Sequence, residues 1–268
     1  MNLRPAIYLY SFATVAAGVV DLVWGDFERA HQPIQAFGDN IPPHTIFAYA
    51  VAFGLIVGGV AVLSPRSARR GAAILGVVYT IFAILWLPRL YTAPHILGQH
   101  IPVYIGVLGG MGTQVIVAAA AAIVYAASSK QTTAQADRTT RMVRWIFGLC
   151  AVAFGLAHLT GISGNEGLVP KYMPFGQAFW TIFTGVAFVL AGLAFVTAIL
   201  DVLAARLLAT MFFVFSVLAL APLIFKYPNA EGSWGTNAYN LAAVASAWIF
   251  AEWLAARRSL AAQPMTVA

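Results

Sequence analysis

The stretches AGVVDLVW (17–24) and FGLAHLTG (154–161) decide the fold, because they hold the same place in the two halves of the chain. Each lies near the end of the first apolar run of its half. In both stretches a glycine precedes an ionisable residue by the same spacing: Gly18 and Asp21, then Gly155 and His158. Self-similarity at a fixed offset predicts an internal duplication, which constrains the fold before any single residue is interpreted.

A second match between the halves comes late in each of them. GGMGT (109–113) and GSWGT (232–236) each open an Ala-rich run with the pattern Gly-x-x-Gly-Thr. The stretch between the halves, SSKQTTAQADRTTR (128–141), is polar and is typical of an exposed connector. We therefore predict a first repeat, a linker and a second repeat over residues 1–127, 128–143 and 144–268.

The composition indicates that lipid is the natural solvent of this chain. Of its 268 residues, 61% are hydrophobic and 9% are charged, whereas a soluble domain carries roughly 25% charged residues. At about 20 residues a span, the length fits eight helices. We predict an all-α polytopic membrane protein whose eight transmembrane helices form two four-helix bundles, with Pro88 and Pro222 ending the third and seventh helices. The expected helices cover 6–24, 45–63, 71–88, 103–127, 144–162, 177–199, 203–224 and 236–255.

The basic residues are distributed unevenly among the connecting segments. Most of the 15 Lys and Arg residues fall at the termini and in alternate loops, which predicts that these segments are cytoplasmic. Both termini are then cytoplasmic, and four helices in each half make the repeats parallel rather than inverted. We expect the inner membrane of a bacterium, contact with the lipid bilayer, and no nucleic-acid partner for the net charge of +6. The outer segments hold the remaining basic residues, Arg29, Arg89, Lys171 and Lys226.

The ionisable residues of the repeats are the first candidates for function. A buried charge in a membrane span is costly and needs a reason. Because Asp21 and His158 occupy equivalent places, we predict that they pair at the outer end of a shared cleft, where they relay protons or hold a polar headgroup. The alternative is that each lies solvated at the lipid–water boundary. The other cleft candidates are Trp24, His44, Tyr172 and Trp180, whose aromatic members form either a membrane belt or a flat slot for a quinone or isoprenoid ring.

Metal and haem chemistry have little support in the sequence. Histidines gather on the outer side, at His31, His44, His95 and His100, but no acidic or cysteine partner stands near His95 and His100. The two are weak metal-ligand candidates, and we expect a wet loop instead. A single cysteine, Cys150, excludes disulfides and Cys-x-x-Cys chemistry within one chain. No bis-histidine haem site is expected, because only His158 lies in a span.

The second half resembles a known family. The run LVPKYMPFGQAFWTIFTGVAFVLAGLAFV (168–196), preceded by FGLAHLTGI, is similar to the DoxX-like membrane proteins. The residues that carry the resemblance are Pro170, Pro174, Trp180, Gly185 and Gly192, matched more loosely in the first half by Pro42, Pro43, Phe47 and Gly59. The resemblance implies a four-helix bundle for each unit, and a link to quinone-coupled oxidoreductase complexes.

The expected function is that of a membrane subunit or accessory protein. It is expected to bind quinone or another lipid-soluble molecule in an outward-facing cleft. We also expect a membrane or periplasmic redox partner protein and a homo-oligomer. The alternatives are a non-enzymatic assembly partner of a membrane complex and a small-solute transporter. The sequence leaves open whether the protein is an enzyme.

Overall fold

A computed structural model describes residues 3–27 and 44–262 of the chain, and the sites predicted at Arg29, His31, Pro42 and Pro43 lie outside this part. Within it every regular element is a helix. The long helices are α1 (Arg4–Trp24), α3 (His44–Ala61), α4 (Ala68–Leu85), α6 (Ile101–Ala127), α7 (Thr133–Thr160), α9 (Gln177–Thr197), α10 (Asp201–Phe215) and α12 (Glu231–Ala261). The short ones are α5 (Arg89–Leu97), α8 (Ile162–Asn165), the 3-10 turn η1 (Glu166–Leu168), the π-helical η2 (Ser216–Leu220) and α11 (Ala221–Lys226).

Seven of the helices described by the structure are long and apolar enough to cross a membrane. They are α1, α3, α4, α6, α7, α9 and the continuous helix from α10 to α11. The chain is therefore a polytopic helical membrane protein. The long helix α12 differs because much of its surface faces protein, with Ala242–Ala245, Ile249 and Phe250 fully or almost fully buried. A helix enclosed by other helices does not need an apolar face for lipid.

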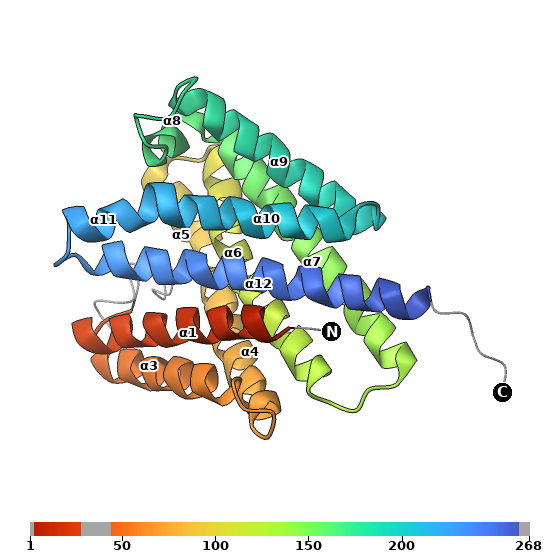
Figure 1. Cartoon of the computed structure of the whole chain (residues 1–268). Helices are drawn as coiled ribbons and strands as arrows, with labels where there is room; N and C mark the ends of the chain where they lie inside the picture. Colours follow the sequence, from red (N-terminus) through yellow and green to blue (C-terminus); the bar gives the residue numbers. More distant parts are fainter. Residues whose placement is uncertain (1–2, 28–43, 263–268) are drawn as a thin grey trace, which may run out of the picture.

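The helices make the same order of contacts in the two halves. In the first half α1 packs on α3, α3 on α4 and α4 on α6, and in the second α7 packs on α9, α9 on α10 and α10 on α12. The halves are also joined, because α6 packs on α7, α12 packs on α1, and α6 and α12 touch each other. Figure 1 shows α1 and α12 antiparallel and side by side. The eight long helices thus form one body rather than two separate bundles.

Small residues allow the first two helices of each half to approach closely. A Cβ atom on Gly18 of α1 would lie 2.7 Å from the backbone oxygen of Ala52 in α3. A Cβ atom on Gly155 of α7 would lie 2.6 Å from the backbone oxygen of Gly185 in α9. These distances are too short for any residue but glycine, so the paired glycines serve helix packing within the protein.

The predicted linker is shorter in the structure than in the sequence analysis. Helix α7 begins at Thr133 rather than near residue 144, because Thr132 and Gln135 form a capping box that starts the helix inside the polar stretch. The first turns of α7 are then held against α12. Trp253 Nε1 donates to Thr140 Oγ1 over 3.0 Å, and Arg257 pairs with Asp137 at 2.5 Å. The polar composition of this segment therefore led to the prediction of a linker, although its polar side chains belong to a helix and bind α12.

The expectation that Pro222 ends the seventh helix is wrong. The chain passes from α10 through η2 into α11 and stays helical to Lys226. Proline has no N–H to donate to the carbonyl four residues before it, and here that carbonyl, on Leu218, accepts the Tyr172 hydroxyl over 3.1 Å instead. Asn240 of α12 donates to the Phe212 oxygen over 2.7 Å, which satisfies the start of the π-helical turn.

Candidate functional site

The first-half candidates lie at the end of α1 and the start of α3. Asp21 is fully buried in the last turns of α1, and its backbone oxygen accepts the N–H of Gly25 over 3.0 Å. Trp24 is 38% exposed. His44 pairs through Nε2 with the carboxylate of Asp26 at 2.6 Å. The sequence analysis missed Asp26, whose signal is its position directly after the glycine that ends α1.

The second-half candidates gather around α7, η2 and α9. The Nδ1 atom of His158 donates to the backbone oxygen of Phe154 over 2.8 Å, and its ring packs on Phe188 with centroids 5.2 Å apart. Trp180 Nε1 donates to the Pro174 oxygen over 2.6 Å. Tyr172 holds η2 as described above. These bonds fix aromatic side chains at one end of the protein, where a membrane belt would lie.

The structure does not join Asp21 to His158. Both residues are described, and no hydrogen bond or ion pair connects them. Helix α1 lies against α3 and α12, whereas α7 lies against α6 and α9. The predicted carboxylate–imidazole pair is therefore absent. Helices α1 and α7 each pack on the second helix of their own half and the last helix of the other half, so they are not main neighbours of each other. Asp21, Trp24 and His44 belong to α1 and α3, whereas His158, Tyr172 and Trp180 belong to α7, the segment before α9, and α9.

The histidines of the outer connection do not form a metal site in the described part of the chain. His95 lies in α5, a helix that replaces the expected wet loop, and its Nδ1 donates to the Tyr91 oxygen over 2.7 Å. His100 precedes α6. Nowhere in residues 3–27 and 44–262 do three His, Cys, Asp or Glu side chains group as metal ligands. Cys150 is a buried free thiol.

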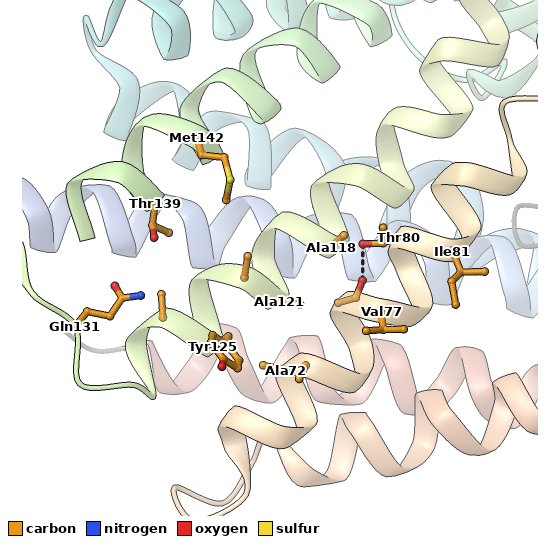
Figure 2. A pocket seen from close by; sticks show the side chains of 14 residues that line it. Ala72, Val77, Thr80, Ile81, Ala118, Ala121, Tyr125, Gln131, Thr139 and Met142 are labelled. Atoms are coloured by element: carbon orange, nitrogen blue, oxygen red, sulfur yellow. Dashed lines mark hydrogen bonds between the residues drawn. The ribbon is translucent and has the colours of Figure 1, made fainter. Parts of the chain in front are cut away.

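An open groove lies on the side of the protein. It has a volume of about 540 Å³ and lies between α4 and α7, with α6 beneath it. Figure 2 shows side chains of α4 on one side, those of α6 in the middle, and Thr139 and Met142 of α7 on the other. The lining is mostly apolar and includes Ala72, Ala73, Gly76, Val77, Thr80, Ala118, Ala121 and Ala122.

Helix spacing explains why a groove forms here. On α4 the residues Ala72, Gly76 and Thr80 follow one another at intervals of four, so they line one face with small side chains. The Thr80 hydroxyl donates to the Gly76 oxygen over 2.6 Å and so stays within its own helix. Helices α4 and α7 both pack on α6, but neither is a main neighbour of the other in the described structure. Small residues on α6 cannot fill the space left between them.

The groove opens at one end into a basic pocket, which we call the basic mouth. The mouth is defined by Arg69, Lys130 and Arg138, together with Tyr125, Ser129, Gln131, Gln135 and Thr139, and has a volume of about 320 Å³. Tyr125, Gln131 and Thr139 also line the groove, so the two cavities adjoin each other. Arg69 donates through Nη2 to the Tyr125 hydroxyl over 2.7 Å, and no acidic residue lines the mouth among the residues described. The neighbouring Asp137 is bound to Arg257.

A buried ion cluster lies at the same end of the protein and was not recognised in the sequence. Asp201, at the start of α10, is fully buried. Its carboxylate contacts Arg144 at 2.6 Å and Arg258 at 2.5 Å, so it ties α7 and α12 to the start of α10. Arg258 also donates to the oxygen of Ala198, over 2.8 Å. The sequence did not predict this cluster, because Arg144, Asp201 and Arg258 are far apart along the chain.

Comparisons of the chain with family models, with curated proteins and with solved structures find no match. The groove and its basic mouth therefore have to be interpreted from their own chemistry.

Proposed function

We propose that the chain is a duplicated, DoxX-like membrane protein of eight spans with both termini in the cytoplasm. Support for the duplication comes from the matching order of helix contacts in the two halves. Support for α12 as the eighth span comes from its 31-residue length and its enclosed position. The end that holds the basic mouth, Arg144, Arg257 and Arg258 is the cytoplasmic end by the positive-inside rule.

The function we propose is to bind a lipid-soluble molecule in the groove between α4, α6 and α7. The single observation that carries this proposal is an apolar groove of about 540 Å³ on the flank of a membrane protein, which shares lining residues with an adjoining polar mouth. A pocket with an apolar body and a few convergent polar groups is the usual form of a small-molecule site. A quinone or a lipid enters such a groove sideways from the bilayer without passing through water.

This proposal moves the site away from the outward-facing cleft of the sequence analysis. The groove shares no residue with the set Asp21, Trp24, His44, His158, Tyr172 and Trp180. The groove opens toward the basic end. A redox partner of a quinone-linked complex would therefore dock from the cytoplasmic side. No Asp, Glu, His, Lys or Arg side chain lines the groove itself among the residues described, and we propose binding rather than catalysis.

Native mass spectrometry of the detergent-purified protein tests the proposal. We expect one defined lipid-soluble molecule per chain, retained under gentle activation. Gly76→Leu should fill the groove and remove it, since a Cβ atom there has room, 3.6 Å from the Ala121 Cβ. Gly106→Leu is the matched control, because a Cβ atom at Gly106 meets nothing within 4 Å. Heterogeneous lipid that is unchanged by Gly76→Leu would overturn the proposal and favour an assembly-partner role.

A further inference from the structure

We infer that the groove and the basic mouth together bind one anionic glycerophospholipid, with an acyl chain along α6 and the phosphate among Arg69, Lys130 and Arg138. The inference rests on the proposed function and names the class of molecule that the site selects. It depends on the adjacency of an apolar cavity and a cationic one, which are both lined by Tyr125 and Gln131.

The length of the groove fits an acyl chain of one membrane leaflet. Its lining on α4 runs from Ala72 to Ile81, which corresponds to roughly 13 Å of helix at 1.5 Å per residue. One leaflet contributes about half of the ~30 Å hydrocarbon core. The polar end of the groove lies where α4 and α7 begin and α6 ends, so it lies at the level of the lipid headgroups.

The basic mouth has the chemistry of a phosphate site. Its three cationic side chains come from three segments: the start of α4, the α6–α7 connection and the start of α7. The nearest acidic side chain, Asp137, points to Arg257 on α12 and does not neutralise them. The Arg69 guanidinium lies 4.9 Å from the centre of the Tyr125 ring and is oriented by the Tyr125 hydroxyl. A guanidinium held in this way keeps further N–H groups for a phosphate oxygen.

Gln131 gives a second polar contact at the junction of the two cavities. Its side-chain oxygen is buried and has no hydrogen-bond partner among the residues that the structure describes. A buried amide oxygen without a donor is costly, so the site favours a ligand that supplies a hydroxyl. The glycerol headgroup of phosphatidylglycerol supplies both a hydroxyl and a phosphate.

The charges also exclude other occupants of the groove. A quinone is neutral and gains nothing from three cations. Phosphatidylcholine has the same acyl chains and phosphate as phosphatidylglycerol, but its quaternary ammonium is repelled by Lys130, Arg69 and Arg138. A positively charged pocket at the cytoplasmic ends of transmembrane helices is a general form of anionic-lipid site. The structure therefore predicts selection by headgroup charge.

Competitive lipid binding tests this inference. The delipidated full-length protein is titrated with equimolar phosphatidylglycerol and phosphatidylcholine of identical acyl chains and analysed by native mass spectrometry. We expect wild type to bind one phosphatidylglycerol with clear preference. Arg69→Gln and Arg138→Gln should each weaken phosphatidylglycerol about five-fold, and Lys130→Gln combined with Arg138→Gln about 25-fold, with phosphatidylcholine unchanged.

Two controls separate the outcomes. Arg70→Gln removes a neighbouring exposed charge that does not line the mouth, and it should leave the preference intact. Equal binding of the two lipids by wild type, both lost in Gly76→Leu, would overturn the headgroup inference while the groove function stands. If Gly76→Leu keeps both lipids bound, the groove function fails as well. Unfolding curves that match wild type confirm that each variant is folded.

Discussion

Asp201→Asn tests how the basic end of the protein is held together. The substitution keeps the shape of the side chain and removes the charge that faces Arg144 and Arg258. The carboxylate is fully buried at the start of α10, whereas the two arginine side chains are 23% and 48% exposed. The neutral amide keeps one oxygen that can accept from one guanidinium, but its NH2 group is a donor and cannot bind the other.

The size of the effect follows from this burial. Breaking a fully buried ion pair costs about 3–5 kcal/mol. Because both arginines reach water, they recover part of their hydration, and we expect the lower cost of about 2–3 kcal/mol that is typical of hydrogen bonds to charged groups. The loss should fall on the contacts of α10 with α7 and α12.

The measurement is SDS-driven unfolding of the purified protein in mixed micelles, followed by tryptophan fluorescence and by far-UV circular dichroism. Glu252→Gln is the control, because Glu252 lies 3.7 Å from the largely exposed Arg206. A partly exposed pair of this kind is worth about 0–1 kcal/mol. If Asp201→Asn changes the free energy of unfolding by no more than Glu252→Gln does, the buried cluster does not stabilise the fold.

Three further substitutions test the packing of the helices by the same unfolding assay. Gly155→Ala should destabilise the protein by about 1–3 kcal/mol, because the new Cβ would lie 2.6 Å from a backbone oxygen of α9. The control Gly106→Ala should be neutral or stabilising. Equal effects of the two substitutions would contradict close packing at Gly155. Leu200→Gly should stabilise by about 1 kcal/mol, since Leu200 has φ of 54° in the α9–α10 turn, and a loss of stability would show that the leucine side chain matters more than its backbone strain. Trp253→Phe removes the bond to Thr140 and should cost about 0.5–1.5 kcal/mol, with unchanged stability counting against the docking of α7 on α12.

The sequence predicted most of the helices because their signals are local. Apolar runs placed α1, α3, α4, α6 and α9 within a few residues of their observed bounds, whereas α12 extends well beyond both ends of the predicted 236–255. The equivalence of Gly18 and Gly155 also had a local signal, and each glycine faces the second helix of its own half. Seven helices of the described chain have the length and hydropathy of membrane spans. Helix α12 is less apolar, and its extensive burial among other helices explains why.

The candidate site could not be predicted because it depends on contacts between distant segments. The pairing of Asp21 with His158 was inferred from equivalence, but equivalent positions in a duplicated chain face equivalent partners and need not face each other. The groove arises where α4 and α7 flank α6, and no single stretch of sequence carries that arrangement. Alanine and glycine at helical spacing usually pack against a neighbouring helix. Only the structure shows that no helix covers these small residues at the groove.

The basic mouth illustrates the same limit. Lys130 and Arg138 lie in the polar stretch that the sequence predicts to be a cytoplasmic connector. That prediction explains their positive charge, but it does not predict that both side chains line one cavity. Because α7 starts at Thr133, Arg138 is carried on a helical turn next to Thr139, and both reach the cavity that Arg69 lines from α4. The polar linker of the sequence analysis is therefore part of the candidate site.

Photo-crosslinking in membranes tests the central claim most directly. Phosphatidylglycerol with a diazirine in its acyl chain is incorporated into vesicles that contain the full-length protein, and the adducts are mapped by peptide mass spectrometry. The account predicts adducts concentrated on the groove lining of α4, α6 and α7, at positions such as Val77 and Met142, and their loss in Gly76→Leu. Adducts spread evenly over exposed apolar residues elsewhere, such as Phe53 and Leu190, and unchanged by Gly76→Leu, would contradict it.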